Sequence, residues 1–114
     1  MEIGHAPLTE PPGLAMHGDV DMATAPALDD ALADAIRESD GAFVVDLSGV
    51  EFLDSSGLKL LLRARALLGR EDRALAVVCP RGRVRRVFEL SGVAELFTFC
   101  ASREEAFAAL VPVG

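Results

Sequence analysis

The feature that most constrains the fold is a pair of short apolar segments separated by a leucine-rich stretch. Residues 42–47 and 74–79 are rich in β-branched or aromatic residues and are bounded by glycine, serine or proline, which is typical of buried strands. Residues 58–68 between them are strong helix formers. Strands that alternate with helices predict an α/β domain in which helices cover a sheet.

The sequence before these segments predicts a hairpin and a helix. Extended runs over residues 3–8 and 14–18 are separated by a turn rich in proline and glycine, which favours a β-hairpin. Thr24 as an N-cap and Pro26 in the first turn favour a helix that ends before Gly41. The chain is therefore expected to open with two strands and a helix.

After the second apolar segment the sequence predicts three further short elements. Apolar residues over 84–90 recur at helical spacing, and residues 95–99 form a short extended run. Ser102 followed by Glu105 is a capping pattern, which predicts a last helix through Leu110. A helix, a strand and a helix are thus expected to complete the domain.

Length and composition fit one domain. The chain has 114 residues, enough to bury one core without disulfides or a structural metal. We predict a single domain over residues 1–114, with its core within about 14–110. Apolar runs stop well short of the roughly 20 residues of a membrane helix, and the N-terminus lacks the features of a signal peptide. We therefore expect a cytoplasmic protein that does not insert into a membrane.

Charge argues against nucleic acid as a partner. The chain has 18 acidic and 11 basic residues and a net charge of −7, which repels phosphate backbones. The absence of tryptophan and tyrosine leaves few rings for base stacking. The one basic cluster consists of Arg81, Arg83, Arg85 and Arg86. We interpret it as a solvated helix face, with a site for phosphates or an acidic partner as the alternative.

The cysteines and histidines do not form a recognisable metal site. Cys79 and Cys100 lie outside any CxxC pattern, and His5 and His17 lack metal-ligand spacing with carboxylates or cysteines. We predict two buried, reduced thiols, no metal and no cofactor.

The segment Asp54-Ser55-Ser56-Gly57 precedes the leucine-rich helix. Its polar side chains are good N-caps, because they can accept hydrogen bonds from amides of the first turn. A helix N-terminus can also accommodate a phosphate. Catalysis is disfavoured because the segment lacks the first glycine of a G-x-S-x-G elbow, no C-terminal histidine follows, and the chain has no Walker A sequence. We predict that the protein is not an enzyme.

Five segments, in order along the chain, resemble the STAS domain, a family named for sulfate transporters and anti-sigma factor antagonists. They are Gly18-Asp19-Val20-Asp21 with Thr24-Ala25 and Leu28, Val44-Val45-Asp46-Leu47-Ser48, Phe52-Leu53-Asp54-Ser55-Ser56-Gly57-Leu58, Val87-Phe88-Glu89-Leu90-Ser91-Gly92-Val93, and Ser102 with Glu105-Ala106. The resemblance implies an α/β, STAS-like single domain with a mixed sheet of about four to five strands, covered by about four α-helices.

The resemblance further implies an anti-sigma factor antagonist. Such a protein binds an anti-sigma factor, usually one with serine kinase activity, and thereby frees a sigma factor. The kinase phosphorylates the serine directly after the motif's aspartate, here Ser55, and a serine phosphatase acting on the phosphorylated form restores it. The residues implied in partner binding are Asp21, Thr24, Asp54, Ser55, Ser56 and Gly57. Helical geometry adds Leu58 and Leu62, which lie on one flank of the helix that follows Ser55.

Two other functions remain open. A STAS regulatory subunit of a membrane lipid or anion transport complex would bind its partner constitutively, whereas the intact Asp54-Ser55 pair favours the switch. A scaffold within a larger stress-signalling assembly is the less favoured third alternative.

Overall fold

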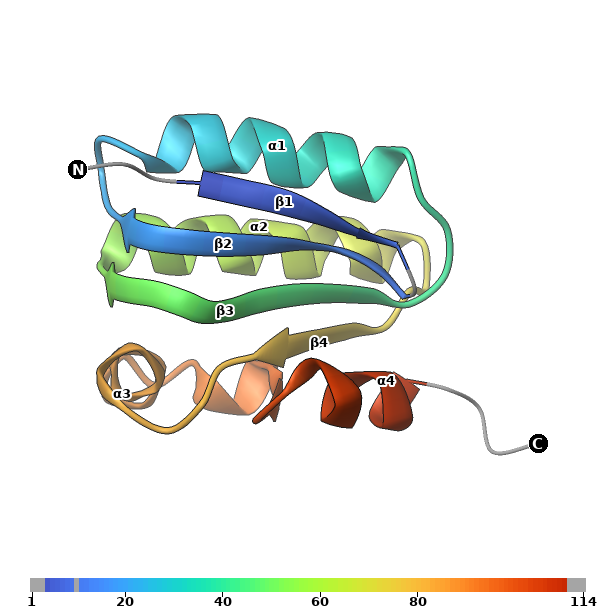
Figure 1. The fold of residues 1–114 in the computed structure, drawn as a ribbon. Helices are drawn as coiled ribbons and strands as arrows, with labels where there is room; N and C mark the ends of the chain where they lie inside the picture. Colours follow the sequence, from blue (N-terminus) through green and yellow to red (C-terminus); the bar gives the residue numbers. More distant parts are fainter. Residues whose placement is uncertain (1–3, 10, 111–114) are drawn as a thin grey trace.

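A five-stranded sheet organises the chain (Figure 1), and its strands run in the order β1-β2-β3-β4-β5. This computed structural model describes residues 4–9 and 11–110. The strands are β1 (Gly4–Thr9), β2 (Pro12–Val20), β3 (Phe43–Leu53), β4 (Leu75–Val78) and β5 (Thr98–Cys100). The helices are α1 (Ala25–Arg37), α2 (Ser55–Arg70), α3 (Arg83–Leu90), α4 (Arg103–Leu110) and the short 3-10 helix η1 (Ala94–Leu96).

The sheet is mixed, as predicted. β1 and β2 form the expected antiparallel hairpin, and the pairs β2–β3, β3–β4 and β4–β5 are parallel. Parallel strands require crossover connections, and here α1, α2 and α3 supply them. The predicted class of a mixed sheet covered by about four helices is confirmed.

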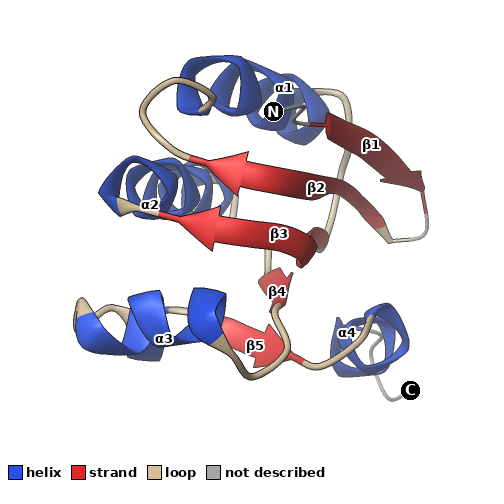
Figure 2. Cartoon of the chain, turned by 60° about the vertical axis from the view of Figure 1, so that its left-hand side comes forward, coloured by secondary structure: helices blue, strands red, loops and turns tan. Residues whose placement is uncertain are grey.

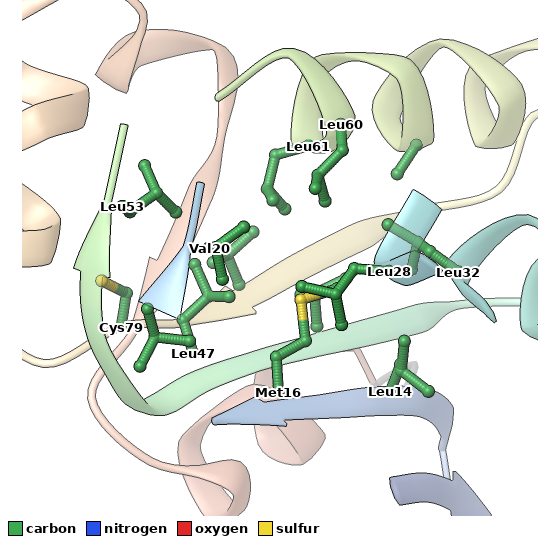
Figure 3. Packing of buried hydrophobic residues seen from close by; sticks show 14 of the residues in the cluster. Leu14, Met16, Val20, Leu28, Leu32, Leu47, Leu53, Leu60, Leu61 and Cys79 are labelled. Atoms are coloured by element: carbon green, nitrogen blue, oxygen red, sulfur yellow. The ribbon is translucent and has the colours of Figure 1, made fainter. Parts of the chain in front are cut away.

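The helices divide between the two faces of the sheet. The larger core lies between one face and the helices α1, α2 and α3, and it includes Leu14, Leu28, Leu61 and Phe88. Figure 3 shows Leu14 and Met16 of β2 pointing toward the buried leucines of α1 and α2. A smaller core on the opposite face packs Ala106 of α4 against residues of β3, β4 and β5. Figure 2 shows α4 on the other side of the sheet from α1, α2 and α3.

Several boundaries differ from the predicted ones. The strand predicted over 42–47 continues to Leu53, because parallel pairing with β2 carries it past the Ser48-Gly49 turn signal. The helix predicted from Leu58 begins at Ser55 and passes through Gly69. The strand predicted over 95–99 was wrong in its first half, where η1 replaces it and only residues 98–100 pair with β4.

The two cysteines are buried and unpaired, as predicted. Cys79 belongs to the larger core and Cys100 to the smaller one, so the sheet separates their side chains. Burial raises the pKa of the Cys79 thiol to about 11, which keeps the thiol protonated at neutral pH.

Within the described residues, no helix has the length and apolar character needed to cross a bilayer.

One buried carboxylate ties α4 to the sheet. Asp46 of β3 is only 3% exposed, and it accepts hydrogen bonds from the Ser48 amide (2.8 Å), the Ser48 hydroxyl (2.6 Å) and Arg103 Nε (2.5 Å). Burial alone would raise the pKa of Asp46, but these hydrogen bonds outweigh it and hold the pKa below the ordinary 3.8. The ionised carboxylate is therefore part of the folded structure.

Replacing this carboxylate should lower the free energy of unfolding and reduce its dependence on pH. We expect Asp46→Asn to lower the free energy of unfolding by about 1–3 kcal/mol, because a charge-assisted contact to Arg103 is lost. The pKa is lowered on folding, so the stabilisation is present above the unfolded value of 3.8 and is lost as the pH falls through the lowered pKa.

Urea unfolding between pH 7 and pH 3 measures both effects. Asp34→Asn is the control, since Asp34 forms an exposed pair with Arg37 on α1 and should change stability by less than about 0.5 kcal/mol. If Asp46→Asn unfolds like the wild type at every pH, the ion pair does not stabilise α4.

Candidate functional site

Ser55 is the first residue of α2 and its side chain is exposed. The cap of this helix is Asp54, whose Oδ1 accepts hydrogen bonds from the amides of Ser56 (2.8 Å) and Gly57 (3.3 Å). The Asp54 carbonyl accepts the next one, from the Leu58 amide at 3.0 Å. Among the residues that the structure describes, none forms a hydrogen bond with the Ser55 hydroxyl, which leaves it free to react.

The start of α2 is held against the ends of β2 and β3. The Asp54 amide donates to the Val20 carbonyl at 3.2 Å, which joins the loop after β3 to the last residue of β2. Gly57 lies so close to these strands that a Cβ there would be 2.7 Å from Leu53 Cγ and 3.0 Å from Val20 Cγ1. A hydrogen at this position lets the first turn of α2 approach the sheet.

A methyl group at position 57 should therefore disturb the site. We expect Gly57→Ala to lower the free energy of unfolding by about 1–3 kcal/mol, because overpacking moves the first turn of α2 away from Leu53 and Val20. Gly69→Ala in the same helix is the control. No atom lies within 4 Å of its Cβ position, so alanine should stabilise the protein by about 0.4–1 kcal/mol. Equal melting temperatures for the two variants would contradict the close approach at Gly57.

The loop between β2 and α1 adjoins this helix start. Asp21 Oδ1 accepts hydrogen bonds from the amides of Ala23 (3.0 Å) and Thr24 (3.1 Å). The Thr24 hydroxyl accepts from the Asp21 amide (3.0 Å) and donates to the Asp19 carbonyl (2.8 Å). Thr24 occupies the N-cap position of α1, as predicted, yet its hydroxyl shapes the loop and does not cap the helix. Asp21 and Thr24 thus fix the loop that lies beside Ser55.

The predicted flank of α2 is only partly available to a partner. Leu58 is 7% exposed and belongs to the larger core, whereas Leu62 is half-buried. Leu58 can therefore affect a binding surface only indirectly, by packing α2 against the larger core. Ser56 is half-buried, and Gly57, in the first turn of α2, is buried.

Two exposed apolar residues near Ser55 were not identified from the sequence. Met22 in the loop before α1 is 78% exposed, and Phe52 near the end of β3 is 51% exposed. Phe52 lies between outward-facing Glu51 and buried Leu53, so the strand gives no strict alternation to follow. The pairing of β3 with β2 is also irregular here, with a register shift between Gly18 and Asp19, the partner of Phe52.

A groove of about 430 Å³ continues this surface between α1 and α2. Its lining residues are Met22, Ala25, Pro26, Asp29, Asp30, Ser56, Lys59, Leu60 and Arg63. Arg63 and Asp29 form an ion pair across it. The groove thus combines apolar and charged side chains beside the exposed serine.

Among the residues that the structure describes, no histidine is hydrogen-bonded to Ser55 at the start of α2. The His17 side chain lies against Gly4 and Gly49 of the sheet, and no hydrogen bond joins it to Ser55. Within residues 4–9 and 11–110, no three His, Cys, Asp or Glu side chains are grouped to hold a metal ion. What the site offers is an exposed, unengaged hydroxyl on a rigid helix start.

Comparisons with known proteins identify the family. The family model described as "Mlab, STAS domain" matches residues 6–98. The Mycobacterium tuberculosis protein named anti-sigma-F factor antagonist RsfB is 33% identical over 93 residues, which are 82% of this chain and 75% of that protein.

Solved structures agree with this assignment. The crystal structure of an anti-sigma factor antagonist from Mycobacterium paratuberculosis superimposes with a TM-score of 0.88 at 33% identity, covering 96% of this chain and 94% of that chain. The unphosphorylated form of SpoIIAA superimposes with a TM-score of 0.75 at 22% identity, covering 97% of this chain and 100% of that chain. At this low identity the comparison supports a shared fold only. The chain belongs to the STAS domain family.

Proposed function

We propose that this protein is an anti-sigma factor antagonist whose binding is controlled by phosphorylation of Ser55. In its unmodified form it binds an anti-sigma factor and so frees a sigma factor. The observation that carries the proposal is the exposed Ser55 hydroxyl, which is not engaged by the Asp54 cap and lies at an edge with exposed Met22 and Phe52. Relatives of similar length at 33% identity carry the name of such antagonists.

The modification would act on the surface and leave the fold intact. A phosphate carries a charge of about −1.5 to −2, and a helix N-terminus tolerates negative charge. Asp54 already satisfies the amides of Ser56 and Gly57, so the phosphate need not replace any contact inside the domain. In an interface, an unpaired charge costs about 2–5 kcal/mol, which is roughly 30-fold to several thousand-fold in affinity.

The phosphoryl chemistry in this proposal belongs to the partners. The anti-sigma factor acts as the serine kinase that uses ATP, and a serine phosphatase removes the phosphate. The protein itself is not an enzyme and needs no cofactor. Since sigma factors act in the cytoplasm, this role also assigns the protein to the cytoplasm.

Two substitutions at Ser55 test the proposal. We expect Ser55→Ala to block phosphorylation by the kinase and to bind the anti-sigma factor like the wild type, because the cap is Asp54 and losing an exposed hydroxyl costs less than about 0.5 kcal/mol. We expect Ser55→Asp to remain folded but to bind about 30-fold more weakly or worse, because it places a charge in the interface. Isothermal titration against anti-sigma factors of the same genome, with a thermal melt of each variant, measures both.

Ser56→Ala is the matched control, since Ser56 is adjacent but half-buried. It should remain a substrate of the kinase, with one phosphate found on Ser55 by mass spectrometry. Equal affinities of Ser55→Ala and Ser55→Asp with intact folds would reject Ser55 as the switch. That result would favour a constitutive subunit of a membrane transport complex.

A further inference from the structure

The helix α3 and the loop before it carry a cluster of four arginines. Arg81, Arg83 and Arg86 are exposed, and Arg85 is half-buried with its guanidinium 4.2 Å from the centre of the Phe99 ring. These four are among only 11 basic residues in a chain of net charge −7. None of the four makes an ion pair with any residue that the structure describes, and the same holds for Lys59, Arg65 and Arg70, whereas Arg37, Arg63, Arg73 and Arg103 are paired.

The packing of α3 determines which of these side chains face outward. Phe88 is fully buried, and its ring meets those of Phe97 and Phe99 at 5.3 and 5.0 Å. At about 100° per residue, Arg83, Arg86 and Leu90 form a stripe on the side of the helix opposite Phe88. Leu90 is 75% exposed. The outer stripe of α3 therefore presents two unpaired cations and one leucine to the solvent.

The helix α3 lies at the same end of the sheet as the start of α2 (Figure 1). Glu51 of β3 lines a cavity of about 180 Å³ together with Arg81 and Arg83. Ser55 follows Glu51 by four residues, which span at most about 14 Å of chain. A standard interface of about 800 Å² per partner is roughly 30 Å across, so a partner centred on Ser55 reaches about 15 Å from it, as far as Glu51 and the cavity that Glu51 shares with Arg81 and Arg83.

The distribution of charge indicates what kind of surface fits here. The acidic residues Asp29, Asp30 and Asp34 lie on α1, and α2 lies between α1 and α3 (Figure 2). A nucleic acid carries phosphates over its whole length and would be repelled by the net charge of −7. A folded protein can instead present a local acidic patch to the arginines alone, which favours complementary pairing over nonspecific binding.

We propose that Arg83 and Arg86 of α3 dock an acidic patch of the same anti-sigma factor that covers Ser55. This inference rests on the proposed function, because it names a further contact of that complex. The arginines increase the association rate of the anti-sigma factor and orient it over the surface around Ser55.

Reversing the charge of the stripe tests this docking contact. We expect the double variant Arg83→Glu/Arg86→Glu to associate with the anti-sigma factor about tenfold more slowly at low salt, and its association rate should depend less on salt concentration. Stopped-flow association from 20 mM to 500 mM salt measures both. Acidic residues near the start of a helix are tolerated, and a thermal melt confirms that the variant is folded.

The double variant Arg37→Glu/Arg70→Glu is the control. It makes the same change in net charge with exposed residues in the last turns of α1 and α2, at the other end of the sheet. Its association rate should fall by less than about threefold at 100 mM salt and above, where charges beyond about 10 Å are screened.

The outcomes separate this inference from the proposed function. If the unmodified wild type binds no anti-sigma factor of its genome, the proposed function fails and this contact fails with it. If the wild type binds but both double variants associate equally fast, only the docking contact is rejected. If the arginines are needed to bind a DNA duplex while anti-sigma association is unchanged, the surface is a nucleic-acid site and the inference is wrong.

Discussion

The close approach between the first turn of α2 and the ends of β2 and β3 is the constraint on which the site depends. A side chain at Gly57 would collide with Leu53 and Val20, and the Asp54 amide is bonded to the Val20 carbonyl. With the backbone held from two strands and the cap provided by Asp54, the helix start is rigid without any contribution from Ser55. The fold thus positions the Ser55 hydroxyl without using it in a hydrogen bond to any described residue.

Under the proposed function, this arrangement would let a phosphate on Ser55 act without a change of fold. A charged group at the start of α2 meets solvent and a favourable helix dipole, and the buried contacts beneath it remain in place. The same group would lie between a partner and the apolar side chains of Met22 and Phe52, which are exposed at this edge. The proposed regulation would therefore act at the surface, because the buried contacts stay in place and the Ser55 hydroxyl makes no hydrogen bond within the described residues.

The sequence predicted the place of Ser55 at a helix start better than the boundaries of the strands. Ser55 at a helix start follows from capping residues before a run of strong helix formers, which is local information. The length of β3 depends on its pairing with β2, and the burial of Leu58 depends on the packing of α2 against the rest of the larger core. The exposure of Phe52 and the unpaired state of the α3 arginines also arise from contacts between distant segments, so the sequence alone could not show them.

The most direct test of this account compares the protein carrying phosphoserine at position 55 with the unmodified protein by two-dimensional amide NMR. Chemical shifts should change only in the first turn of α2 and in the adjoining loops, while core amides such as those of Leu61, Val77 and Phe88 keep their positions. Binding to the anti-sigma factor should be lost in the same sample. Shift changes that spread through the core, or full binding by the phosphorylated protein, would contradict a switch that acts through the surface.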